Sequence, residues 1–106
     1  MAPELRRRGF EVVRCERVTD ALHALRSDGV DALIAGVDLG GMSGLELSRR
    51  VFADHEGLPV LLVVPDGDPE LVDAATLTGA FSVLAAPVDA QVLELTLDRA
   101  VEHMAL

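Results

Sequence analysis

The sequence predicts an α/β fold, an open parallel sheet of about four strands and four helices with helices on both faces. Three observations predict it: apolar runs of strand length, helical segments with recognisable ends, and their regular alternation along 106 residues. Alternation at this rhythm favours right-handed crossovers between parallel strands. Because a chain of this length builds a single core, we expect one domain spanning residues 1–106.

Four runs have the length and composition of strands. They are rich in β-branched or aliphatic side chains and are bounded by turn residues. In chain order they are Glu11–Cys15, Ala32–Val37, Val60–Val64 and Ser82–Ala85. The middle two are almost wholly apolar, so we expect both of their faces to be buried.

The first two predicted helices have clear ends. One opens at Thr19 and Asp20 and stops before Gly29, which we expect to adopt a left-handed backbone as a cap. The next follows Ser43, and Glu46 stands at the spacing of a capping box.

The last two predicted helices begin at acidic caps. Asp68, Pro69 and Glu70 form an N-cap, a first-turn proline and a favourable first-turn acid, in a segment that ends by Gly79. The final helix runs from about Asp89 to the C-terminus. Its apolar stripe consists of Leu93, Leu97, Val101 and Met104.

Charge is distributed unevenly and restricts the partners. The net charge is −9, and all of it falls in residues 51–106, where Arg99 is the only basic residue against ten acids. An acidic surface repels nucleic acid and anionic lipid, and the Arg6–Arg8 run is too short to reverse this, so we expect neither as a partner. The absence of lysine, tryptophan and tyrosine excludes P-loop and Schiff-base lysines and most stacking platforms.

Location follows from apolar runs and cysteine usage. No stretch approaches the roughly 18 apolar residues of a membrane span, and we expect a cytoplasmic protein. The single cysteine, Cys15, cannot form an internal disulfide and is expected to be a small buried apolar residue, with a reactive thiol as the alternative.

Two motifs carry a resemblance to a known family. The segments GMSGLEL (41–47) and GAFSVLAAP (79–87), in their strand and helix context, are similar to the receiver domain of response regulators in two-component signalling. The resemblance covers residues 5–103 and is nearest to receivers that precede transcription-activator modules. It implies a flavodoxin-like fold.

The residues that perform the family's chemistry are absent. The resemblance assigns the phosphoacceptor aspartate to Gly36, the hydroxyl residue to Val64 and the lysine to Ala86. The aromatic residue that reports activation falls on Val83. Without a nucleophilic carboxylate, a metal and a cation there is no transition-state stabilisation, so we expect no enzymatic activity, no cofactor and no metal site.

Because the chain begins in what resembles the family's first helix, Ala2–Arg8, the resemblance also leads us to expect that the family's first strand, with its acidic pair for Mg²⁺, is missing. That strand is central in the family, so its loss leaves a gap of roughly 9.5 Å. Three remedies remain open: Glu11–Cys15 pairs with Ala32–Val37, a partner chain donates or exchanges an element, or the protein starts further upstream. We favour self-association, as a dimer or by strand exchange.

Other polar groups have competing interpretations. Asp38 is an off-register candidate for the phosphoacceptor, and a solvated loop acid is the simpler alternative. Asp66, Asp68 and Glu70 suggest a divalent-ion cluster, but a turn and a helix cap explain them. The three histidines have no metal-ligand spacing; they are His23, His55 and His103.

The expected function is a phosphorylation-independent interaction module in bacterial two-component or phosphorelay signalling. The alternative is a fragment or mis-started form of a longer response regulator with an output domain. The expected partner is a protein with a basic surface, or a second copy of the chain. The candidate interaction surface comprises Asp73, Val83, Glu94, Asp98 and Glu102.

Overall fold

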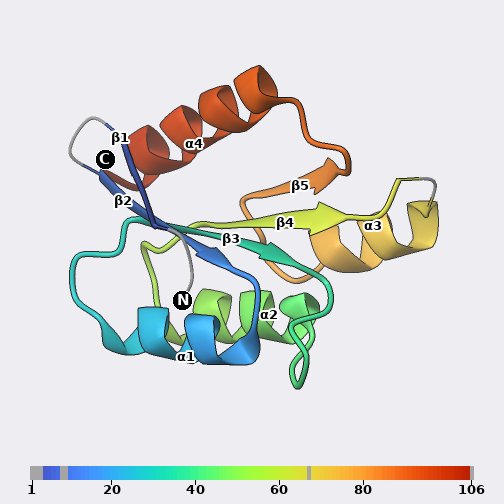
Figure 1. The fold of residues 1–106 in the computed structure, drawn as a ribbon, viewed down its shortest axis with the longest axis horizontal. Helices are drawn as coiled ribbons and strands as arrows, with labels where there is room; N and C mark the ends of the chain where they lie inside the picture. The colour runs from blue at the N-terminus through green and yellow to red at the C-terminus, as the bar shows by residue number, and fades with distance from the viewer. Residues whose placement is uncertain (1–3, 8–9, 67, 106) are drawn as a thin grey trace.

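The computed structural model describes residues 4–7, 10–66 and 68–105, and its centre is a five-stranded sheet (Figure 1). The strands are β1 Glu4–Arg7, β2 Phe10–Cys15, β3 Ala32–Gly36, β4 Val60–Val64 and β5 Ser82–Ala85. The helices are α1 Val18–Arg26, α2 Gly44–Asp54, α3 Pro69–Thr76 and α4 Ala90–Ala105.

The strands lie side by side in the order β1-β2-β3-β4-β5, which is also their order along the chain. β2 to β5 are mutually parallel, whereas β1 is antiparallel to β2 and forms an edge. Four parallel strands and four helices confirm the predicted fold class. Burial of β3 and β4 confirms that both faces of these two strands are covered.

The N-terminal segment differs from the prediction. Residues Glu4–Arg7 form strand β1, paired from Glu4 opposite Val13 to Arg7 opposite Phe10, so a helix at Ala2–Arg8 is wrong for residues 4–7. Residues 2, 3 and 8 lie outside the described part of the chain. Pairing with the outer edge of β2 satisfies backbone groups that an edge strand would otherwise leave to solvent.

The expected gap in the sheet is closed within one chain. β2 pairs directly with β3, with Val13 opposite Leu33 and Cys15 opposite Ala35. This is the first of the three remedies, and it supplies hydrogen-bond partners to both strands. The pairing of β2 with β3 therefore needs no element from a second copy.

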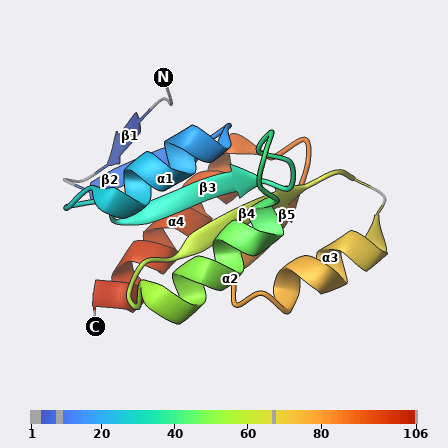
Figure 2. The same ribbon diagram turned by 90° about the horizontal axis from the view of Figure 1, so that it is seen from below.

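The helices are divided unequally between the two faces of the sheet. α1, α2 and α3 cover one face and α4 alone covers the other (Figure 2). Right-handed crossovers between strands that advance in one direction put every connecting helix on the same face. Only α4, which follows the last strand, is free to cross to the opposite face.

Each face has its own apolar core. The larger core lies beneath α1, α2 and α3 and includes the fully buried Leu33, Leu47 and Leu62. The smaller core joins α4 to the sheet and comprises Val12, Ala32, Ile34, Leu61, Leu97, Ala100 and Val101. The predicted stripe on α4 is thereby confirmed at Leu97 and Val101.

Hydrogen bonds confirm two of the predicted helix starts, at Ser43 and Asp68, whereas α1 begins at Val18, after Arg17, and not at Thr19 and Asp20. The Ser43 hydroxyl accepts from the backbone N–H of Leu45 at 3.0 Å, and Asp68 accepts from Leu71 at 3.0 Å. Gly29 has the predicted left-handed backbone, with φ 85°, but it is not the cap, because α1 ends at Arg26 with Ser27 as an extended C-cap. These local signals fixed where the elements begin because each cap acts within its own few residues.

Candidate functional site

A pocket of about 440 Å³ lies at the edge of the sheet where the parallel strands end. It brings together Gly36 at the end of β3, Asp38 beyond it, and Ala86 just after β5, with Arg14 and Cys15 from the end of β2. In open α/β sheets this carboxyl edge is where ligands bind. We therefore take it as the candidate site and call it the rim pocket.

Gly36 sits beside a tight contact between β3 and α2. A Cβ atom on Gly44, the first residue of α2, would collide with the carbonyl group of Gly36. The Gly44 N–H also donates to the Val37 carbonyl at 2.9 Å. At Gly36 itself an added Cβ would meet only the Val63 carbonyl oxygen, at 4.0 Å. There is therefore room for a Cβ atom at Gly36.

Ala86 and Val64 are neighbours, but only one of them reaches the pocket. The Ala86 N–H donates to the Val64 carbonyl at 2.8 Å. Ala86 lines the pocket, whereas the Val64 side chain is fully buried in the larger core. Val83, on β5, is partly buried and packs against that same core. None of the three offers a polar side-chain atom.

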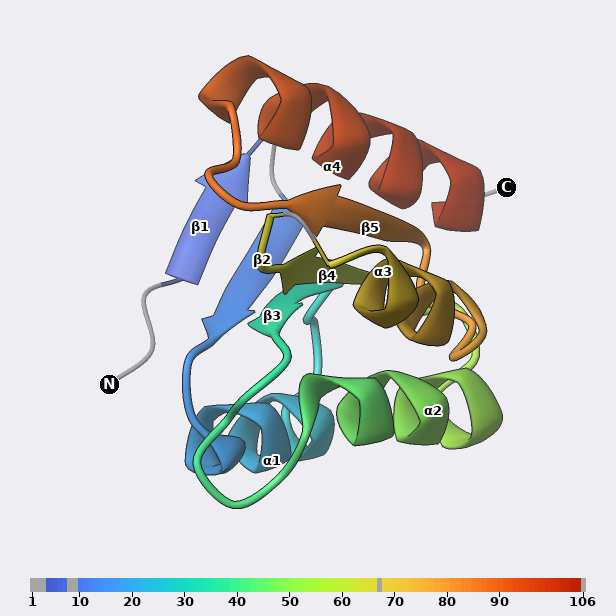
Figure 3. The same cartoon turned by 90° about the vertical axis from the view of Figure 1, so that its right-hand side faces the viewer.

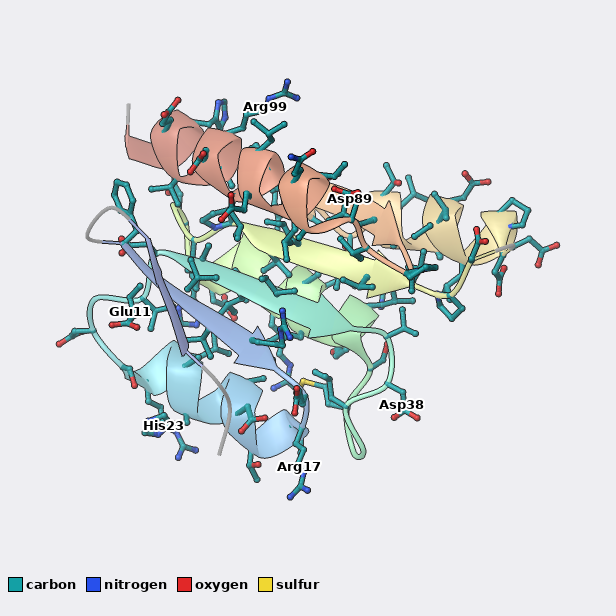
Figure 4. All side chains as sticks on the ribbon, turned by 45° about the horizontal axis from the view of Figure 1, so that its top comes forward. Glu11, Arg17, His23, Asp38, Asp89 and Arg99 are labelled. Atoms are coloured by element: carbon teal, nitrogen blue, oxygen red, sulfur yellow. The ribbon has the colours of Figure 1, made fainter. Side chains whose placement is uncertain are left out.

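Asp38 is the nearest carboxylate in sequence to Gly36. It lies in the loop beyond β3, is exposed, and accepts a hydrogen bond from the Gly40 N–H at 2.9 Å (Figure 4). Its position on the pocket wall keeps it a candidate acid. The hydrogen bond to its own loop is also what a solvated turn residue makes.

Sequence reasoning missed two charged residues of the rim pocket. Arg14 is partly buried on β2, and the exposed Glu16 follows that strand. Both reach the site because β2 pairs directly with β3. The available signal was the single arginine inside the apolar run EVVRC, which has no obvious role in a buried strand.

The Cys15 thiol on the pocket wall is buried and has low reactivity. Cys15 is 2% exposed. Burial, with a smaller contribution from the Asp20 carboxylate, raises the pKa of the Cys15 thiol from 9.0 to about 12. At neutral pH the sulfur therefore stays protonated, which favours the structural interpretation of this cysteine.

The predicted acidic cluster and the three histidines do not come together in a common site. Asp68 caps α3 through Leu71, as the simpler interpretation expected. His55 and His103 line a second pocket of about 400 Å³ at the opposite end of the strands, where the His103 ring lies 5.8 Å from the Phe81 ring at a tilt of 51°. His23 is exposed on α1 (Figure 4) and is not among the residues described as lining either pocket. Among the described residues, no three ligand side chains group as a metal site.

The predicted interaction surface spans α3, β5 and α4. These elements lie one above another at one edge of the sheet (Figure 3). Asp73 is exposed on α3, and Glu94 and Glu102 are exposed on α4, where Asp98 is partly buried. Two exposed apolar side chains, Val92 and Leu95, lie on α4 at 47% and 59% exposure.

The described part of the chain contains no helix that could cross a membrane.

Comparison with known proteins gives a consistent family. Residues 1–98 match the model of the response regulator receiver domain. The chain is 32% identical over 97 residues to the transcriptional regulatory protein GlrR of Escherichia coli, which covers 92% of the chain and 22% of GlrR. It is 34% identical over 98 residues to the C4-dicarboxylate transport regulatory protein DctD of Rhizobium meliloti, covering 92% and 21%. The chain thus spans about a fifth of these relatives.

Solved structures agree in fold. The signal receiver domain of an HD domain-containing protein from Pseudomonas fluorescens superposes with a TM-score of 0.74 at 32% identity, over 84% of this chain and 72% of that one. NtrX from Brucella abortus gives 0.74 at 26% identity, over 84% and 21%. The similarity therefore extends from the sequence motifs to the arrangement of the sheet and helices.

Proposed function

The chain belongs to the response regulator receiver domain family, and on that premise we propose that it is the receiver part of a longer response regulator and signals without aspartyl phosphorylation. The relatives GlrR and DctD are transcriptional regulatory proteins about five times the matched length. An output function in transcription is part of this proposal, and so are a cytoplasmic location and the absence of catalysis by this domain.

The observation that carries the proposal is the chemistry of the rim pocket. Phosphoryl transfer to a receiver needs a carboxylate nucleophile, a metal and a cation that neutralise developing charge. Gly36 and Ala86 line the pocket without side-chain polar atoms, and Val64 lies in the core. The scaffold therefore retains the family's packing while lacking its reacting groups, which is the degeneracy we propose.

Intact-mass spectrometry after incubation with Mg²⁺ and a small phosphodonor tests this. The protein is expected to keep its mass. Stable addition of one phosphoryl group to this chain overturns the proposal. An Asp38→Asn variant then identifies the off-register acid, since modification of Asp38 disappears in that variant.

The signal would pass by contact with another protein across the α3, β5 and α4 surface. Exposed acids and the apolar Val92 and Leu95 support a partner with a basic rim and an apolar centre. The same exposed apolar side chains on α4 also support self-association, in which a second copy of the chain would cover them. Light scattering with size-exclusion chromatography, comparing wild type with Leu95→Glu, tests the dimer: a mass that does not change with the substitution counts against this surface.

A second candidate is a free-standing interaction module with no output domain. The continuous sheet supports a free-standing module, since β2 and β3 pair within one chain and need no strand from another. Reading the genomic frame on both sides of the coding segment discriminates the two. A continuous frame into an output domain supports the regulator, and stop codons on both sides support the free-standing module.

A further inference from the structure

The rim pocket contains a charged group that the proposed function does not use. Arg14 projects from β2 into its lining and is partly buried. Among the residues that the structure describes, its guanidinium has no hydrogen bond or ion pair. A partly desolvated cation without a partner is costly, and a carboxylate or phosphate relieves that cost through charge-assisted hydrogen bonds.

The rest of the lining is largely apolar. Ile34 and Val63 lie on the adjacent strands, and Val88 and Leu93 lie on the segment that leads into α4 and on its first turns. A volume of about 440 Å³ is within the roughly 300–1,000 Å³ typical of small-molecule sites. Among the described residues, the pocket thus offers one cation, Arg14, beside an apolar wall, a combination suited to an amphiphilic anion.

Two carboxylates at the mouth limit what can enter. Glu16 and Asp38 are both exposed, and Asp38 is held by the Gly40 N–H. Solvent and salt screen exposed charges strongly, whereas the partly buried Arg14 is screened less. A compact, multiply charged anion is repelled by both acids and gains nothing from the apolar wall, so a singly charged ligand with an apolar body fits best.

We propose that the rim pocket binds a small apolar monocarboxylate, with the carboxylate on Arg14 and the apolar body against Ile34, Val63, Val88 and Leu93. This inference rests on the proposal that the site is not phosphorylated, because both occupants would use the same space. Such a ligand would connect the domain to a metabolite in place of a phosphoryl group.

Titration of hexanoate into the isotope-labelled protein, followed by amide chemical shifts, tests the site. Gly36 and Ala86 both line the pocket, so their amides are expected to shift and saturate at millimolar hexanoate. Hexanamide, which lacks the charge, and acetate, which lacks the chain, are each expected to bind roughly tenfold more weakly.

Arg14→Met retains the length and apolar stem of the side chain. It is expected to weaken hexanoate roughly tenfold or more while leaving hexanamide unchanged. Arg26→Met, at the exposed end of α1, is the matched control and should bind hexanoate as the wild type does. Val88→Trp fills the pocket while Arg14 is intact and should abolish hexanoate binding. It therefore tests the site even if the Arg14→Met variant folds poorly.

Absence of saturable shifts, or hexanoate binding unaffected by Arg14→Met and Val88→Trp, overturns the inference. Inorganic phosphate binding as tightly as hexanoate also overturns it, because the apolar wall would then contribute nothing. These outcomes are distinct from a failure of the proposed function, which appears as a covalent mass gain with the phosphodonor.

Discussion

The hydroxyl groups of Ser48 and Thr78 lie 2.8 Å apart and form a hydrogen bond buried between α2 and the end of α3. The Thr78 hydroxyl also lies 2.6 Å from the Ala75 carbonyl, which accepts a hydrogen bond from it. Both side chains are almost fully buried, at 1% and 3% exposure. The pair is therefore a buried polar contact that joins α2 to the turn after α3, between two residues 30 positions apart in sequence.

Removing one partner of this pair should destabilise the protein more than removing both. Thr78→Val leaves the Ser48 hydroxyl buried without a partner, and the expected loss is about 1–3 kcal/mol in the free energy of unfolding. The double variant Ser48→Ala with Thr78→Val should recover part of that loss. Urea unfolding of the two single variants and the double variant measures the coupling; strictly additive losses would contradict it.

Gly44 should tolerate no side chain. A Cβ there would collide with the Gly36 carbonyl, so Gly44→Ala must push α2 away from β3. We expect a loss of at least about 2 kcal/mol in the free energy of unfolding. Gly36→Ala is the matched control, because its Cβ meets nothing closer than 4.0 Å and the change should cost far less. Equal stability of the two variants would refute the close contact.

Alkaline pH should destabilise the protein through the Cys15 thiol. The folded-state pKa of Cys15 is about 12, above its ordinary 9.0, so the stabilisation is complete below pH 9 and is lost as pH rises toward 12. The sequence contains no lysine or tyrosine, which removes the side chains that otherwise titrate in this range. The expected loss is about 1 kcal/mol per pH unit.

The control for this titration is Cys15→Ala. That variant should be less stable at every pH because it leaves a small cavity, but its stability should stay level between pH 9 and pH 11. Urea unfolding across the range, with thiolate absorbance recorded on the folded protein, gives both quantities. If the free energy of unfolding falls equally with pH in the wild type and in Cys15→Ala, a group other than Cys15 causes the pH dependence.

The start of α4 should depend on one carboxylate. Asp89 accepts hydrogen bonds from the N–H groups of Gln91 at 2.8 Å and Val92 at 3.2 Å. Asp89→Ala is expected to cost about 1 kcal/mol, and Asp89→Asn should retain most of the stability, since asparagine also caps well. Asp73→Ala, an exposed change within α3, serves as control and should stay within about 0.5 kcal/mol in thermal unfolding.

Local sequence signals predicted most of the elements. The strands Val60–Val64 and Ser82–Ala85 match the structure residue for residue, and the other two differ by one residue at one end. Caps at Ser43, Asp68 and Asp89 lie where the helices begin. These succeed because strand runs and caps depend on neighbours a few residues away.

The arrangement of the N-terminal half could not be predicted in the same way. Strand β1 exists because Glu4–Arg7 meets the outer edge of β2, and no pattern in the four residues ELRR indicates a partner. Arg14 reaches the rim pocket only because β2 occupies the place beside β3. Gly36 and Ala86 are 50 residues apart in the sequence, so their position on one pocket wall depends on the whole sheet.

The order of the strands has a consequence for how the molecule forms. Each strand neighbours the one before it in sequence, so no strand has to enter between two that are already paired. Paired residues of neighbouring parallel strands are 20 to 27 residues apart, as in Val12–Ala32 and Leu33–Val60, so each step closes a single crossover, and a longer connection would cost more entropy. A chain emerging from the ribosome could add one strand and one helix at a time, each on an edge already in place.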